Sequence, residues 1–261
     1  KEQSFFLFLS YNAPHLPLQA TPKYLERFNE IKNPKRKTYA AMVSAVDDGV
    51  GQLLETLKEN NLEQDTLIFF LSDNGGPTTK NASRNNPLRG NKGDVWEGGF
   101  RVPFAARWPA KFPKGSVYDL PVSSLDIFAT IAALSSAKLD EQRPLDGVNL
   151  VPYVRGEIQT PPHNAIYLRK FDQQRYAIRR GDYKHVVPVK GGKSQLYNLK
   201  NDIGETKNLA LQEPDTLAEL EALRKTWSSE LIDPIFLGLI HLPSFQKKQT
   251  RKTPEKTGQK K

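Results

Sequence analysis

The feature that most constrains the fold is a long amphipathic segment flanked by two short apolar runs. In residues 39–60 the apolar side chains recur at the spacing of one helix face, at Met42, Val43, Val46, Val50, Leu53, Leu54 and Leu57. Residues 4–11 and 66–71 are aromatic and aliphatic without polar alternation, which is typical of buried strands. A strand, a helix and a second strand in this order predict the crossover unit of an α/β sheet.

The later part of the chain extends this pattern and then changes its character. Residues 101–108 predict another strand, and residues 124–134 predict a helix. After Gly156 come short strand candidates (165–168, 176–179, 184–189 and 195–199) and a helix that Pro214 opens. We therefore expect an α/β domain over residues 1–156, with a mixed or parallel sheet flanked by helices. A small antiparallel α+β subdomain over 157–235 and a basic, disordered tail over 236–261 should follow.

Composition excludes several functions. The 261 residues contain no cysteine, so disulfides, thiolate metal sites and a cysteine nucleophile are excluded within them. The formal charge is +9, but six of these charges fall after Gln246, so the charge gives no reason to expect a nucleic-acid partner. No run approaches the ~18–20 apolar residues that span a bilayer. Because a strand-like run opens the chain, we expect it to begin within a domain, and a missing signal peptide says nothing about secretion.

A candidate metal site directly follows the predicted strand at 66–71. Asp73 and Asn74 offer a carboxylate and an amide oxygen side by side, which suits a hard cation such as Ca²⁺ or Mg²⁺. The glycines that come next allow a sharp turn. An ordinary turn would have the same composition, so this motif alone leaves both interpretations open. Another acidic pair, Asp47 and Asp48, lies in mid-helix, where we expect exposed or ion-paired side chains.

Two further segments carry groups suited to binding an anion. His15 lies between prolines after the first predicted strand, where a rigid imidazole can donate a proton, although a surface histidine fits equally well. The polar loop at 78–100 holds Lys92, a point charge for an anionic group, and Trp96, which can wall a pocket. A solvated basic loop is the plainer alternative.

Taken in order, these segments resemble the type I sulfatases, which are formylglycine-dependent enzymes of the alkaline phosphatase superfamily. The resemblance rests on segments of the first domain (14–17, 39–51, 72–76 and 92–103) and of the subdomain (145–150, 180–184 and 196–199, with Glu205 and 208–210). It extends to about Leu231. No single motif is decisive, but the ordered set is specific.

The resemblance implies a sulfuric ester hydrolase and assigns roles. Asp73 and Asn74 would be two ligands of an active-site Ca²⁺, or alternatively Mg²⁺. Lys92 would bind sulfate oxygens, and His15 would contact the ester oxygen and assist the leaving group. By the same resemblance the protein would be secreted, periplasmic or lysosomal.

The family's nucleophile has no counterpart here. Formylglycine is made from Cys or Ser in a Cys/Ser-x-Pro-x-Arg motif, and the one x-Pro-x-Arg run, at 33–36, has Lys32 at the nucleophile position. The family's amino-terminal Asp pair is also missing, so we expect a carboxyl-terminal portion that is inactive alone. A phosphatase or phosphodiesterase of the same superfamily and a non-catalytic carbohydrate-binding protein remain the alternatives.

The substrate is less well defined by the sequence. Arg84 and Arg89, with Trp96, belong to a polar loop suited to an anionic sugar, so we favour a sulfated polysaccharide over a sterol sulfate. An aryl sulfate or another sulfated small molecule also fits the implied chemistry. Nothing in the sequence predicts the oligomeric state.

Overall fold

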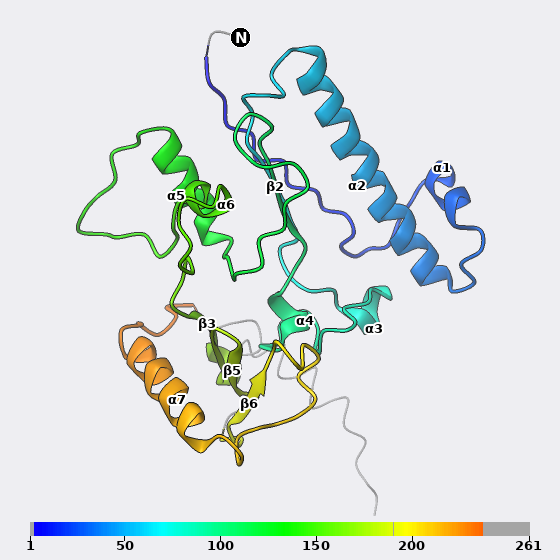
Figure 1. The fold of residues 1–261 in the computed structure, drawn as a ribbon. Helices are drawn as coiled ribbons and strands as arrows, with labels where there is room; N and C mark the ends of the chain where they lie inside the picture. Colours follow the sequence, from blue (N-terminus) through cyan, green and yellow to red (C-terminus); the bar gives the residue numbers. More distant parts are fainter. Residues whose placement is uncertain (1–2, 190, 237–261) are drawn as a thin grey trace, which may run out of the picture. The chain divides into compact units, whose positions relative to one another are not determined.

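The computed structural model describes residues 3–189 and 191–236, which form two compact units that divide between Asn164 and Ala165 (Figure 1). Most of the predicted basic tail, from residue 237 onward, lies outside the described residues.

The first unit combines one long helix, several short helices and a pair of strands. Its elements in chain order are α1 (Pro22–Leu25), the 3-10 turn η1 (Glu26–Phe28), α2 (Pro34–Glu59), β1 (Ile68–Leu71), α3 (Thr78–Asn81), α4 (Glu97–Phe100), β2 (Phe104–Arg107), α5 (Leu125–Leu134) and α6 (Val151–Val154).

Helix α2 confirms the predicted helix and begins at Pro34, five residues before the predicted start at residue 39. Asn33 caps it, because its side-chain oxygen accepts a hydrogen bond from the Arg36 backbone N–H at 3.0 Å. Farther along the helix, Asp48 pairs with Arg27 at 2.8 Å, as expected for a mid-helix carboxylate. The hydrogen bond from Arg27 holds the pKa of the Asp48 carboxyl below its usual value. Asp48 therefore has a structural role.

The predicted strand at 4–11 is not formed. These residues join no strand ladder, and the side chains of the run from Phe5 to Leu9 are between 49% and 79% exposed. Strand β1 instead pairs antiparallel with β2, with Ile68 opposite Arg107 and Leu71 opposite Phe104. The prediction failed because an apolar run signals a tendency to be buried, whereas a strand also needs a neighbouring backbone to hydrogen-bond. The parallel crossover is therefore absent from the described residues.

A buried carboxylate organises the end of the first unit. Asp126 in α5 is fully buried and accepts hydrogen bonds from the backbone N–H groups of Ser123 at 2.6 Å and Val148 at 2.9 Å. The His163 imidazole lies 2.9 Å from the same carboxylate. These contacts tie α5 to the segments that carry Val148 and His163.

The second unit is a four-stranded antiparallel sheet with a helix packed on it. The strands β3 (Ile166–Lys170), β4 (Arg175–Arg180), β5 (Tyr183–Val187) and β6 (Gln195–Asn198) are neighbours in chain order, and the 3-10 turn η2 (Phe171–Gln173) links the first two. Helix α7 (Pro214–Ser229) contributes Leu220 to a core with Ile178 and Leu196. The meander and its helix were both predicted from the sequence, because period-two and helical patterns are local properties.

The second unit also buries a histidine. The side chain of His185 on β5 is fully buried, and its Nδ1 lies 3.3 Å from the Glu221 carboxylate of α7. Burial lowers the pKa of His185 to about 4, and this outweighs the opposing effect of Glu221. Arg224 and Lys225 on the same helix lower the pKa further.

We expect this histidine to make the fold sensitive to acid. The pKa of His185 is lower in the folded chain than the ~6.5 of an unfolded histidine, so its contribution to stability is complete above pH ~6.5. The contribution falls as the pH drops towards 4, by about 2–3 kcal/mol. Urea unfolding at pH 7.5, 5.5 and 4.5 should show a steeper loss for the wild type than for His185→Gln. The exposed His15→Gln variant should match the wild type. Equal pH profiles for wild type and His185→Gln would contradict this expectation.

Candidate active site

The candidate active site is built from two loops of the first unit that meet next to the β1–β2 pair. The loop after β1 donates backbone hydrogen bonds to the segment before β2, from Ser72 to Pro103 at 3.2 Å and from Gly75 to Gly99 at 2.9 Å. A third bond runs from the Lys92 N–H to the Gly76 carbonyl at 3.4 Å. The backbone thus joins the loop that carries Asp73 and Asn74 to the loop that carries Lys92.

Glycines allow these loops to approach so closely. A Cβ atom at Gly75 would lie 1.8 Å from the Gly98 carbonyl oxygen, and one at Gly99 would lie 2.2 Å from the Asp94 carbonyl oxygen. Neither position has room for a side chain unless the backbone moves. The glycine content of this region therefore serves contact between the loops.

Asp73 and Asn74 present oxygen atoms that suit a hard cation. The Asn74 amide nitrogen donates to the Gly75 carbonyl at 3.1 Å, which leaves its amide oxygen turned away from that contact. Asp73 is exposed, and its carboxylate forms no ion pair within the described residues. The pair therefore fits the donor set of Ca²⁺ or Mg²⁺. It supplies two ligands, and within residues 3–189 and 191–236 no group of three or more His, Cys, Asp or Glu side chains is arranged for a metal.

Lys92 lies at an exposed tip of the second loop. The turn around it is braced by Asp94, whose Oδ2 accepts from the Asn91 backbone N–H at 3.0 Å and from the Asn91 amide at 2.9 Å. The position of the Lys92 backbone is therefore well defined, while its ammonium group is available to an anion.

The structure does not join His15 to the other candidates by hydrogen bonds. The imidazole Nδ1 lies 2.8 Å from the Leu16 carbonyl oxygen. The backbone N–H of His15 donates to the Asn12 carbonyl at 2.9 Å. Among the described residues these bonds stay within its own exposed loop. The role of His15 therefore remains a proposal.

The candidates for substrate binding fall in two places. The Arg89 guanidinium stacks over the Trp96 ring, 3.7 Å from its centroid, so these two side chains form one surface. Along the chain they flank Lys92. Arg84 is exposed and lines a different pocket, together with the start of α2.

Sequence reasoning missed Asn85, which holds the backbone of the loop that carries Asp73 and Asn74 at Gly76. Its side-chain oxygen accepts from the Gly76 N–H at 3.0 Å, and its amide nitrogen donates to the carbonyls of Gly76 at 2.9 Å and Gly90 at 3.0 Å. An asparagine in a polar loop looks like turn chemistry, so nothing in its neighbourhood marked this bridging role.

Comparison with known proteins identifies the class. The sulfatase family model matches residues 1–137, and a second model, described as N-sulphoglucosamine sulphohydrolase, C-terminal, matches residues 91–230. Because the first match spans more than half of the chain, the chain belongs to the sulfatase family.

Individual relatives agree with this assignment. The crystal structure of Ps i-CgsB in complex with k-i-k-neocarrahexaose is 39% identical, with a TM-score of 0.86 over 98% of this chain and 56% of that one. The uncharacterized sulfatase YdeN of Escherichia coli (strain K12) is 29% identical over 85% of this chain and 46% of its own length. Human steryl-sulfatase is 35% identical over 64% of this chain and 29% of its own length.

These matches confirm the predicted α/β sulfatase fold. The mixed or parallel sheet expected within residues 1–156 is not seen in the described residues, where β1 and β2 pair antiparallel. The chain spans about half the length of Ps i-CgsB and of YdeN. No helix of residues 3–189 and 191–236 combines the length and apolar character needed to cross a bilayer.

Proposed function

We propose that the protein, at its full natural length, hydrolyses sulfate esters, and that its substrate is a sulfated carbohydrate or an aryl sulfate. The observation that carries the proposal is the set of three backbone hydrogen bonds that joins the Asp73–Asn74 loop to the segment from Lys92 to Pro103. Oxygen ligands for a cation and a lysine for an anion thereby share one framework. Sulfatase family membership supports reading this framework as a sulfate-ester site.

In this proposal Lys92 binds the sulfate oxygens and His15 assists the leaving group. Negative charge grows on the ester oxygen as the S–O bond breaks, so a cation held beside it stabilises the transition state more than the ground state. An imidazole can donate a proton to the departing oxygen near neutral pH. The exposed positions of Lys92 and His15 leave both groups accessible to a substrate.

Asp73 and Asn74 would hold a Ca²⁺ ion, or alternatively Mg²⁺. Such a cation would supply positive charge that polarises the sulfate group. The Asn74 amide nitrogen is engaged by the Gly75 carbonyl, which leaves the amide oxygen as the atom for a cation, and Asp73 is exposed; both support this assignment.

For the substrate class, we favour a sulfated polysaccharide. The likeness to Ps i-CgsB, a structure with bound neocarrahexaose, supports a carbohydrate. The stacked Arg89 and Trp96 side chains offer a flat apolar surface with a positive charge, which suits a sugar ring bearing anionic groups. Arg84 would reach a more distant part of the same chain.

Calcium dependence tests the metal assignment. We expect Asp73→Ala to weaken Ca²⁺ binding at least ~10-fold in calorimetry, because a hard cation loses one of its few charged ligands. Sulfate release by the wild type should stop on chelation and return with added Ca²⁺. The matched control is Asp65→Ala, which removes an exposed carboxylate outside the site. Unchanged Ca²⁺ affinity in Asp73→Ala would exclude this ligand, and faster hydrolysis of phosphate esters than of sulfate esters would reject the sulfatase proposal.

A further inference from the structure

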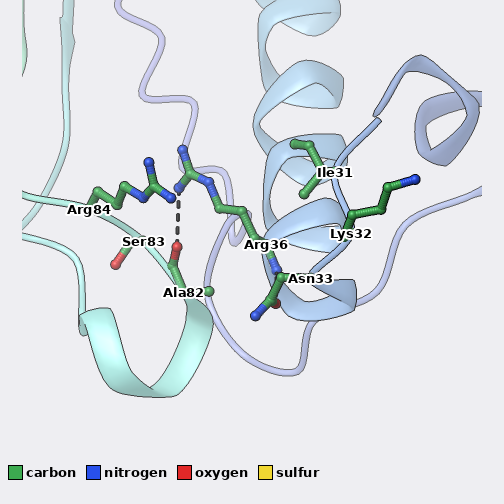
Figure 2. Close-up of a pocket in the computed structure, with 7 residues that line it drawn as sticks. All are labelled: Ile31, Lys32, Asn33, Arg36, Ala82, Ser83 and Arg84. Carbon is green, nitrogen blue, oxygen red and sulfur yellow. Dashed lines mark hydrogen bonds between the residues drawn. The ribbon is translucent and has the colours of Figure 1, made fainter. Parts of the chain in front are cut away.

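A second candidate binding site is a pocket between the start of α2 and the segment that follows α3, and its lining includes none of Asp73, Asn74 and Lys92. The pocket has a volume of about 430 Å³, within the range of ligand sites. Its lining includes Lys32, Asn33 and Arg36 from one side and Ser83 and Arg84 from the other (Figure 2). All of these residues belong to the first unit.

The lining of this pocket is strongly positive. Lys32, Arg36 and Arg84 each carry a full positive charge, and no acidic residue lines the pocket. Figure 2 shows the Arg36 and Arg84 side chains pointing toward one another. Within residues 3–189 and 191–236, none of the three cations forms an ion pair. Like charges that face one another repel, and an anion placed between them would relieve that repulsion.

Other groups in the pocket favour an anion as well. Helix α2 begins at Pro34, beside the pocket, and the start of a helix carries partial positive charge. Arg36 is held in place because its Nη1 donates to the Ala82 carbonyl at 3.2 Å and its guanidinium stacks on Tyr39. The Arg36 guanidinium therefore has little freedom to move within the pocket.

The pocket is connected to the candidate active site through a short stretch of chain. Ser83 is buried and its Oγ has no hydrogen-bond partner in the described residues. The same Oγ atom packs against Gly76, since a Cβ there would lie 2.2 Å from it. Gly76 in turn accepts from the Lys92 N–H and is held by Asn85. One framework thus supports both the lysine of the site and the arginine of the pocket.

We propose that this pocket is an anion subsite for a second anionic group, a sulfate or a carboxylate, of the same saccharide chain whose sulfate ester lies at Lys92. This inference rests on the proposed function, because it takes the substrate to be a sulfated carbohydrate. The pocket selects substrates that carry more than one negative charge.

Binding of two probes by the full-length protein tests the proposal apart from catalysis. The first probe is a carrageenan hexasaccharide with several sulfate groups, and the second is para-nitrophenyl sulfate, which has one. We expect the Lys32→Ala/Arg84→Ala double variant to bind the hexasaccharide about five- to tenfold more weakly, because two charge contacts are lost. Its affinity for para-nitrophenyl sulfate should not change.

A matched double variant separates a specific subsite from a general charge effect. Lys35→Ala/Lys80→Ala also removes two positive charges, but from exposed positions on α2 and α3 that do not line the pocket. It should bind both probes as the wild type does. Equal weakening by both double variants, or unchanged hexasaccharide binding by Lys32→Ala/Arg84→Ala, would overturn the proposal.

Two further arms identify the occupant and separate this inference from the proposed function. Inorganic sulfate should weaken hexasaccharide binding by the wild type more than by Lys32→Ala/Arg84→Ala, because only the wild type has the intact pocket for which both ligands compete. Sulfate that binds to the wild type but not to the double variant, without weakening hexasaccharide binding, would mark a site for free anions and overturn the proposal. If full-length protein releases no sulfate but Lys32→Ala/Arg84→Ala still weakens hexasaccharide binding, the proposed function fails and the subsite stands.

Discussion

Replacing Lys92 by alanine should lower kcat/KM for sulfate release about 10²–10³-fold, the magnitude typical of removing one group that stabilises developing charge. Lys92 is exposed at the tip of its loop, while its backbone is fixed by the bond to Gly76. The alanine variant should therefore keep its fold and lose only the ammonium group. The measurement is sulfate release from para-nitrophenyl sulfate by the full-length protein.

Two controls make the Lys92 result specific. Lys92→Arg retains the charge and should recover part of the lost rate, whereas Lys80→Ala removes an exposed charge outside the site and should leave the rate unchanged. Circular dichroism should show the same unfolding midpoint for all three variants. If Lys92→Ala retains more than about half of the wild-type kcat/KM, Lys92 does not bind the reacting sulfate and the site assignment fails.

Replacing Glu205 by alanine should destabilise the second unit by about 3–5 kcal/mol, because it leaves a buried ammonium without its carboxylate. The Lys184 Nζ lies 2.7 Å from the Glu205 carboxylate, and both side chains are fully buried. A typical domain has a total stability of only ~5–15 kcal/mol, so the loss is a large share of it. Urea unfolding followed by circular dichroism at neutral pH measures the change.

Matched variants distinguish a buried charge effect from a loss of packing. The double variant Lys184→Met/Glu205→Leu removes both charges and should lie much closer to the wild type than Glu205→Ala does. On the surface, Arg180 pairs with Glu219 and both side chains are about half exposed, so Glu219→Ala should cost less than ~1 kcal/mol. Similar losses for Glu205→Ala and Glu219→Ala would show that the buried pair contributes no more than a surface pair.

Elements with a local pattern could be predicted from the sequence. The helical spacing that ends near Leu57 predicted α2, and short runs between glycine turns predicted the meander from β3 to β6. The start of α2 at Pro34 was missed because the Asn33 cap precedes the apolar pattern. The strand expected at residues 4–11 failed for a different reason, because strand formation depends on a partner that is distant in sequence.

The site divides in the same way. The sequence indicated Asp73, Asn74 and Lys92 as site candidates. Their residue types and glycine neighbours are typical of oxygen ligands for a cation and of an anion-binding loop. Contacts between segments that are distant in the sequence set the other features. These are the backbone hydrogen bonds between the loops, the bridging role of Asn85, and the buried pair of Lys184 and Glu205.

The sequence alone therefore determined the sulfatase class and the residue types of the site, since residue order and local periodicity carry that information. Only the tertiary structure decided which charges are neutralised. Asp48 and Arg27, which are 21 residues apart in the sequence, form a pair. Lys32, Arg36 and Arg84 instead meet around one pocket without an acidic partner in the described residues. The physical reason is that Coulomb interactions depend on distance in space, and folding sets that distance independently of separation along the chain.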